Sequence, residues 1–269
     1  MLSCGHVIPA SNLFVSPIVQ ARNGASFDFT FSSRNSPSTM LQLGEALVQL
    51  LPFVPDGVVI FFPSYAYLDQ VASKWKEKGG SSEPTLWARL EYSKPIFKES
   101  KSSSSAPGDN TEDVLAAYSA AINNQSGRGA LLLAVIGGKL SEGINFSDQL
   151  GRCVIVVGLP YPNPNAPEWK AKMEYIEQKA AERGLAAGTA SREFAENVCM
   201  RAVNQAIGRA VRHINDWSAI LLIDRRYSQK RITDKLPAWI QASLPADRTA
   251  GTFHDVESGL RKFYSRKTV

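Results

Sequence analysis

Unbroken apolar runs along the chain predict the strands of a buried sheet. Runs of this length, apolar throughout, are typical of strands that are covered on both faces, as in a parallel sheet. A further short strand is expected over residues 94–99, and Phe27, Phe29 and Phe31 alternate with small or polar residues as in a half-buried strand or an extended edge. The unbroken runs cover residues 58–62, 130–136, 153–157 and 219–223, and residues 13–19 form a further run rich in β-forming residues.

Helical periodicity separates these runs, and Pro37, Ser64 and Thr111 stand where helices are expected to begin. Strands that alternate with helices predict an α/β fold with a doubly wound parallel sheet. In such sheets, ligands meet the loops at the carboxyl ends of the strands. The expected helices cover residues 37–51, 64–75, 111–121 and 167–183, followed by a long helix that carries residue 205.

Two polar segments interrupt the pattern. Residues 99–110 are rich in serine and have little to bury, which predicts a mobile surface loop. Residues 248–269 are polar and basic and are expected to form a tail with a short helix over 256–264. We therefore expect one domain over residues 1–247 and a C-terminal tail.

Composition narrows the class of protein. The chain of 269 residues is 44% hydrophobic and carries a net charge of +5, which fits a polyanionic partner without requiring one. Its three cysteines lie far apart, so neither a disulfide framework nor a zinc site is expected. His6 and His213 have no ligand at metal-site spacing, so we expect no metal. Without an apolar run of about 20 residues, a soluble intracellular protein is predicted, with no membrane partner.

The stretch from Gln205 to Asp216 carries the strongest candidate chemistry. On a helix, Gln205, Arg209 and Arg212 share one face, while an apolar set that ends at Ile214 lies opposite. Gly208 leaves room for a bulky ligand, and paired guanidiniums match the oxygens of a phosphoryl group. A solvated basic face, with Asp216 paired to an arginine, explains the pattern equally well.

Three motifs in order resemble the C-terminal motor lobe of superfamily-two helicases, in the form found in iron–sulfur DNA helicases related to the xeroderma pigmentosum group D protein. Two further stretches, Ser3-Cys4-Gly5-His6-Val7-Ile8-Pro9 and Leu236-Pro237-Ala238-Trp239-Ile240, most resemble the chromosome-loss branch of this family, whose members act in sister-chromatid cohesion. The resemblance implies a RecA-like, P-loop NTPase-like fold. The motifs are Phe61-Phe62-Pro63-Ser64-Tyr65 (motif IV), Gly137-Gly138-Lys139-Leu140-Ser141-Glu142-Gly143-Ile144-Asn145-Phe146 (motif V) and Gln205-x-x-Gly208-Arg209-x-x-Arg212 (motif VI).

The chain lacks the parts that hold the triphosphate. Motif V resembles a phosphate-binding loop, but Leu133 and Leu140 replace the glycine and the Ser/Thr that Walker A requires, and there is no Asp-Glu-Ala-His box for magnesium. The resemblance implies that ATP and Mg²⁺ lie between this lobe and a first RecA-like lobe, which also carries the iron–sulfur cluster. No ATP turnover is expected from this chain alone.

The resemblance also implies roles for individual residues. Motif VI supplies Arg212 as the arginine finger, with Arg209 and Gln205 beside it and Gly208 near the nucleotide. Motif V places Glu142, Gly143 and Asn145 at the nucleotide, although many relatives carry Asp at position 145, and Lys139 and Ser141 at the DNA backbone. Ser64, Tyr65 and Tyr161 are expected to contact the strand, although core packing explains either tyrosine equally well, and motif V could be an ordinary strand-to-helix turn.

Two functions are consistent with these features. The first is the second motor lobe of an ATP-dependent 5′-to-3′ DNA helicase in the nucleus, with single-stranded DNA, forked duplex, the first lobe, and cohesion or replication factors as partners. The second is a stand-alone nucleic-acid-binding or regulatory module without turnover. An upstream Walker A motif with clustered cysteines would favour the helicase.

Overall fold

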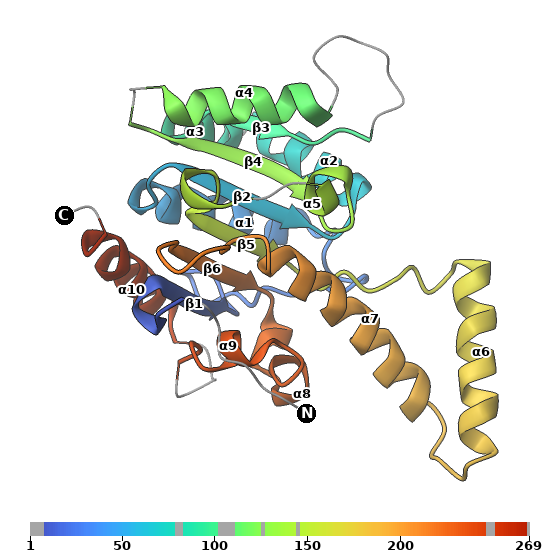
Figure 1. Cartoon of the computed structure of the whole chain (residues 1–269). Helices are drawn as coiled ribbons and strands as arrows, with labels where there is room; N and C mark the ends of the chain where they lie inside the picture. The colour runs from blue at the N-terminus through green and yellow to red at the C-terminus, as the bar shows by residue number, and fades with distance from the viewer. Residues whose placement is uncertain are drawn as a thin grey trace.

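The computed structural model describes residues 8–78, 83–101, 111–124, 127–143, 146–245 and 251–267. Six strands form one sheet in the order β1-β6-β5-β2-β4-β3, and every pairing is parallel. The predicted α/β doubly wound sheet is therefore confirmed (Figure 1). The strands are β1 Leu13–Ile18, β2 Gly57–Phe62, β3 Ile96–Lys98, β4 Ala130–Val135, β5 Cys153–Val157 and β6 Ser218–Ile223.

The central strands are buried on both faces, which explains their continuous apolar sequences. In β2, Val58, Ile60 and Phe62 face one apolar core, while Val59 and Phe61 face the other. The first core is completed by α1 Pro37–Leu50, α2 Tyr65–Lys76, α3 Leu86–Ser93 and α10 Phe253–Ser265. The second is completed mainly by α4 Thr111–Asn123, α7 Thr189–Ile207, α8 Lys230–Thr233 and α9 Ala238–Gln241.

The C-terminal helix α10 belongs to the packed domain. Five of its side chains are buried against the first core, and the Tyr264 hydroxyl donates to the Arg152 carbonyl at 2.6 Å. A capping box between Thr252 and Asp255 fixes where the helix begins. The polar sequence of residues 248–269 thus contains an amphipathic helix, within the segment that sequence analysis treated as a tail.

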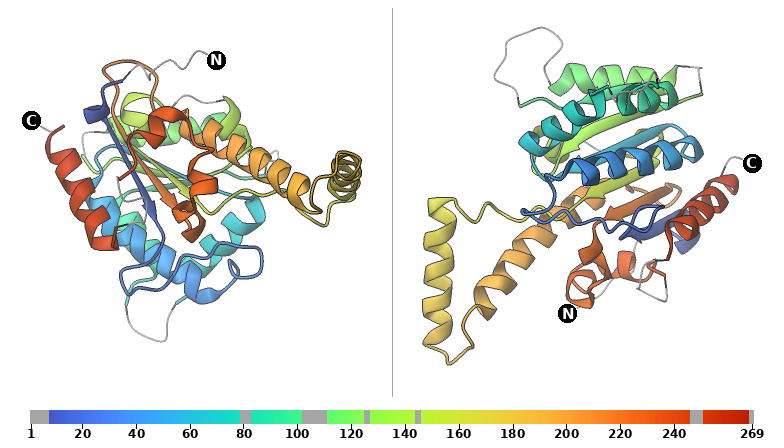
Figure 2. Two further views of the ribbon diagram at one scale, coloured as in Figure 1. Left: turned by 90° about the horizontal axis from the view of Figure 1, so that it is seen from below. Right: turned by 180° about the vertical axis from the view of Figure 1, so that it is seen from behind.

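Helix α6 Pro167–Ala181 and the first part of α7 form a hairpin that projects away from the sheet (Figures 1 and 2). Trp169 and Phe194 pack between the two helices, with ring centroids 5.9 Å apart. At its other end α7 returns to the second core. No helix among the described residues is long and apolar enough to cross a membrane.

The region of Phe27, Phe29 and Phe31 differs from the expected strand. The described chain here forms only an isolated antiparallel bridge, between Gln20 and Ser26. Phe27 and Phe29 are buried and stacked on each other, whereas Phe31 is 62% exposed. The alternation therefore reflects a loop fixed by two buried rings, with the third ring left at the surface.

Candidate functional site

Motif IV lies at the carboxyl end of β2. Ser64 begins α2, and its Oγ accepts a hydrogen bond from the Tyr67 backbone N–H at 3.3 Å, so the predicted helix cap is confirmed. The hydroxyl proton of Ser64 remains a donor for another group. The next residue, Tyr65, is half-buried, and its hydroxyl donates to Glu99 Oε1 at 2.7 Å.

Glu99 connects motif IV to motif V. It follows β3, is 2% exposed, and accepts backbone N–H groups from both sides of the motif V turn: Oε2 from Val135 at 2.9 Å and Oε1 from Leu140 at 3.2 Å. Burial and the Glu99 carboxylate raise the pKa of Tyr65 to about 12, partly offset by the Lys139 backbone N–H. The Tyr65 hydroxyl therefore stays protonated as a donor at neutral pH.

The two glycines that begin motif V serve different purposes. Gly137 has φ +72° and open space around it, so it is required by the backbone conformation. Gly138 has no such conformation, but a Cβ there would lie 2.6 Å from Glu99 Oε1 and 2.7 Å from the Tyr65 hydroxyl. Gly138 therefore allows the turn to pack directly on these two side chains.

After the turn, the chain enters the short helix α5, Lys139–Gly143. Lys139 is exposed, whereas Ser141 is buried and its hydroxyl donates to the Gly138 carbonyl at 2.9 Å. Glu142 and Gly143 end the helix; the side chain of Glu142 and the whole of Asn145 lie outside the described residues.

Motif VI departs from the predicted helix. Helix α7 ends at Ile207 with Gly208 as its C-cap, so only Gln205 lies on the helix and both arginines follow it. Gly208 is a poor helix former, and the chain beyond it is fixed instead by buried Ala210 and Val211. The predicted shared helix face is therefore wrong, and Ile214, expected to be buried, is 57% exposed.

The motif V turn and motif VI nevertheless meet. A cavity of about 240 Å³ lies between them, at the carboxyl edge of the sheet. Arg209 is half-buried at this cavity, and Arg212 lies further along the loop with an exposed side chain. The cavity is lined by Gly137, Ser141, Ala202, Gln205, Ala206 and Arg209.

Asp216 fixes the loop that carries the two arginines. It is 1% exposed, its Oδ2 accepts the Arg212 backbone N–H at 3.2 Å, and its Oδ1 accepts Arg152 Nη1 at 3.0 Å. Oδ1 also accepts the backbone N–H groups of Trp217 and Asp148. Arg152 therefore forms an ion pair with Asp216, and its guanidinium stacks on the Trp217 ring.

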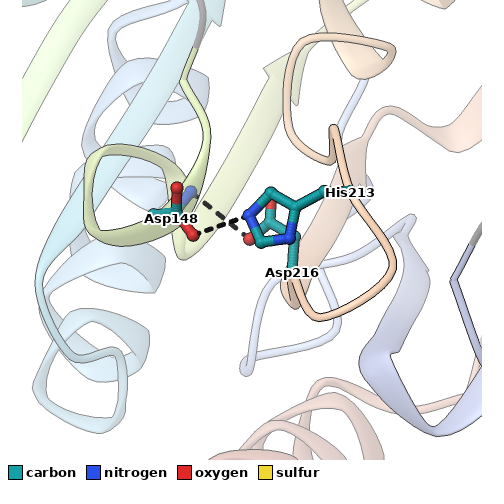
Figure 3. A group of neighbouring side chains, drawn as sticks. All are labelled: Asp148, His213 and Asp216. Atoms are coloured by element: carbon teal, nitrogen blue, oxygen red, sulfur yellow. Dashed lines mark hydrogen bonds and ion pairs between the residues drawn. The ribbon is translucent and has the colours of Figure 1, made fainter.

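Asp148, His213 and Asp216 lie close enough together to offer ligands to a cation (Figure 3). His213 Nε2 is 2.9 Å from Asp148 Oδ1. The Asp216 carboxylate, however, already accepts four N–H donors, one of them from a guanidinium. This group is thus better suited to join the segment after motif V to the motif VI loop than to bind a metal.

A larger groove of about 820 Å³ crosses the same edge of the sheet. Residues that follow β2, β4, β5 and β6 line it, and the chain crosses from one side of β2 to the other between β4 and β5. Ligands of open α/β sheets bind at this kind of switch point. Ser64 and half-buried Tyr161 are brought together there, along with aromatic and basic side chains that we had not predicted: Phe31, Arg34, Trp169 and Arg226.

The two arginines of this groove are held in place by neighbours. Arg226 donates to both oxygens of buried Asp224, at 2.9 and 2.7 Å, and its guanidinium carbon lies 5.5 Å from the Tyr161 ring centroid. Arg34 lies between the Phe31 and Tyr67 rings, 5.1 and 5.3 Å from their centroids. Rigid cations beside aromatic faces suit phosphates and stacked bases.

Glu99, Arg34 and Asp216 were not singled out as site residues in the sequence. Glu99 was placed both at the end of the expected strand 94–99 and in the serine-rich segment 99–110, and its position at the end of a strand was a usable signal. Arg34 stands in a loop whose alternating phenylalanines suggested a strand. Asp216 was expected only as the partner of an arginine, and Arg152 is such a partner.

Comparison with known proteins assigns this chain to a family. The family model described as the helicase C-terminal domain matches residues 47–243, and the chain belongs to this family. It is 46% identical to the ATP-dependent DNA helicase chl1 of Aspergillus clavatus over 98% of the chain, and 43% identical to that of Schizosaccharomyces pombe over 93%. It covers 37% and 29% of these two relatives, or about a third of their length.

Solved XPD structures share the fold. The chain aligns with one described as XPD_APO at a TM-score of 0.56 and 26% identity, covering 83% of this chain and 38% of the other. A second, Xpd4 of S. tokodaii, gives a TM-score of 0.52 at 19% identity, covering 87% of this chain and 37% of the other, and so supports the fold alone. The expected resemblance to the XPD-like family and its CHL1 branch is confirmed.

Proposed function

We propose that this chain is the second motor lobe of an ATP-dependent 5′-to-3′ DNA helicase. The observation that carries the proposal is the cavity between the motif V turn and motif VI, where Gln205 and Arg209 face Gly137 and Ser141. The chain has no Walker A sequence and no Asp-Glu-Ala-His box. The triphosphate and its Mg²⁺ would therefore be held by a first RecA-like lobe and completed from this side.

In this proposal, motif VI supplies positive charge to the transferring phosphoryl group. Arg212 acts as the arginine finger, because it is exposed on a loop that Asp216 fixes through the Arg212 backbone. Arg209 contacts a neighbouring phosphate oxygen, and Gln205 orients it or the attacking water. Gly208, Glu142, Gly143 and Asn145 complete the nucleotide side.

Single-stranded DNA would occupy the larger groove. The Phe31 and Tyr161 rings offer stacking faces, while Ser64 and Arg34 offer donors to phosphates. Lys139 is exposed two residues after Gly137, which lines the groove, and would offer a further donor to the DNA backbone. The hydroxyls of Tyr65 and Ser141 already donate within the fold, so we assign both residues to shaping the strand site.

The names of the relatives support a DNA-processing role, and we extend it to action in the nucleus with cohesion or replication factors. The iron–sulfur cluster of the XPD-like class would lie in the other part of the enzyme. Forked duplex with a 5′ single-stranded tail is the expected substrate.

Strand displacement by a full-length enzyme containing this chain tests the proposal. We expect ATP-dependent unwinding of a fork whose loading strand has a free 5′ tail, and none from a matched fork with only a 3′ tail. Unwinding from the 3′ tail, or unwinding without ATP, would contradict the assignment.

The groove is tested separately by the affinity of this chain for fluorescein-labelled oligo(dT). Tyr161→Ala is expected to weaken binding roughly 5- to 150-fold, as loss of one base-stacking ring costs about 1–3 kcal/mol. Tyr175→Ala is the matched control, since Tyr175 is exposed on α6 and does not line the groove. Equal losses in both variants would place the strand elsewhere.

A further inference from the structure

A buried carboxylate joins the strand side of the lobe to its nucleotide side. Glu99 lies outside the three helicase motifs but contacts two of them: Tyr65 of motif IV through the hydroxyl, and the motif V turn through two backbone N–H groups. With only 2% of its surface exposed, Glu99 cannot reach a ligand. Any effect it has on activity is exerted through the groups it contacts.

We propose that Glu99 is a positioning residue, and that the Tyr65–Glu99 hydrogen bond transmits strand occupancy from motif IV to the motif V turn. The proposal rests on the proposed function, since it needs DNA at the groove and nucleotide at the cavity. Ser64, which directly precedes Tyr65, lines the groove, while Gly137 lines both the groove and the motif V–VI cavity. The link therefore lies between the two sites.

The geometry makes this contact sensitive to small movements. The Tyr65 hydroxyl lies 2.7 Å from Glu99 Oε1. Gly138 lies so close to both groups that a Cβ added to it would be 2.6 Å from Glu99 Oε1 and 2.7 Å from the Tyr65 hydroxyl. A shift of the α2 start, where motif IV would contact a strand, therefore displaces the first residues of α5 through directly contacting atoms.

The carboxylate is better suited to this role than an amide. Each of its oxygens accepts N–H or O–H donors, and three donors surround it. In Glu99→Gln, an NH₂ group replaces one of the two carboxylate oxygens. If it replaces Oε2 it faces the Val135 N–H, and if it replaces Oε1 it faces the Leu140 N–H and the Tyr65 hydroxyl, so at least one donor loses its acceptor. Tyr65→Phe removes the link alone and leaves both backbone contacts of Glu99 intact.

The test compares Tyr65→Phe, Glu99→Gln and the double variant in the full-length helicase, with Tyr92→Phe as control because Tyr92 is 84% exposed. ATPase is measured with and without oligo(dT), together with oligo(dT) affinity and melting temperature. We expect each single variant to lower the ratio of stimulated to basal ATPase by roughly 5-fold or more, the range of an allosteric coupling. Glu99→Gln should leave the affinity for oligo(dT) within about 2-fold of wild type, because buried Glu99 makes no contact with the strand. Loss of a direct contact worth about 1.4 kcal/mol would instead weaken binding about tenfold.

The double variant decides whether the two groups act together. If Tyr65 and Glu99 form one link, the double variant loses as much stimulation as the more affected single variant. If they act separately, its fold loss equals the product of the two single fold losses. Multiplicative losses, or full stimulation in Tyr65→Phe with an unchanged melting temperature, would overturn the link. A wild-type enzyme whose ATPase does not respond to DNA would instead contradict the proposed function itself.

Discussion

The Glu99 network and the motif VI loop show two ways of holding functional groups at the same edge of a sheet. Around Glu99, the residues of motifs IV and V are themselves the packing: Tyr65 and Gly138 touch the carboxylate directly. In the motif VI loop, Arg212 is exposed, and the structural task belongs to Asp216 beneath it. Function and stability should therefore separate at motif VI and remain coupled at motif V.

Arg212→Ala in the full-length enzyme is expected to give the largest effect. Removing an arginine finger should lower DNA-stimulated ATPase by roughly 10³- to 10⁵-fold. The melting temperature should move by no more than roughly 1–2 °C, because an exposed substitution usually changes stability by less than about 0.5 kcal/mol. Steady-state kinetics and thermal melting check the two halves of this prediction.

Arg183→Ala is the matched control, since Arg183 is exposed at the end of α6, away from both cavities. Its activity should equal that of wild type. A large decrease in the melting temperature of Arg212→Ala would show instead that this arginine stabilises the fold. Function and stability would then not separate between Arg212 and Asp216.

Asp216→Ala should produce the largest loss of stability. It leaves Arg152, whose side chain is 9% exposed, without its principal ion-pair partner, and unpaired buried charges cost about 3–5 kcal/mol. Urea denaturation of this chain measures the change. Asp69→Ala, which breaks an exposed pair with Lys98, should cost less than about 1 kcal/mol, and equal costs would show that Asp216 is not a hub.

Substitutions of the two motif V glycines test how the Glu99 network packs. Gly138→Ala should cost about 1–3 kcal/mol by overpacking against Glu99 and Tyr65, and Gly137→Ala about 1–2 kcal/mol by backbone strain alone. Denaturation in a Tyr65→Phe background separates the causes. The cost of Gly138→Ala should fall there, because one clashing atom is gone, while that of Gly137→Ala should not.

The smallest expected effect is a pH dependence at Tyr65. Its pKa is raised to about 12 in the folded chain, so between about pH 10 and 12 the unfolded chain loses this proton first and folding is weakened as pH rises. The contribution is fully present below about pH 10. Denaturation at pH 9, 10 and 11 should show a shallower alkaline loss in Tyr65→Phe than in wild type or in Tyr92→Phe. Identical slopes of unfolding free energy against pH in Tyr65→Phe and wild type would contradict the hydrogen bond between Tyr65 and Glu99.

The sheet could be predicted because its central strands β2, β4 and β5 carry no polar side chain, and a continuous apolar run buried on two faces can be recognised without knowledge of its neighbours. The end of α7 could not, because the apolar spacing continues past Gly208 through Ala210 and Val211. Helix α7 ends at Gly208, and the loop beyond it is held by Asp216, which is itself fixed by Arg152, 64 residues away in the sequence.

The positions of some motif residues could also be anticipated from local sequence, although their roles stay predictions. Motif residues such as Ser64, Gly137 and Gln205 were found from local patterns and do meet at one edge of the sheet. Glu99 was not, because its burial depends on Tyr65, Val135 and Leu140, three residues from two other segments. A charged residue beside a serine-rich run looks exposed until its donors are known.

The central claim is that this chain completes a nucleotide site whose triphosphate is held by another lobe. ATP turnover by this chain alone, and by this chain mixed with a separately expressed first lobe and oligo(dT), tests it most directly. We predict no turnover from the chain alone, turnover from the mixture, and none when the mixture contains Arg212→Ala. Turnover by the isolated chain, or an undiminished rate with Arg212→Ala, would contradict the claim.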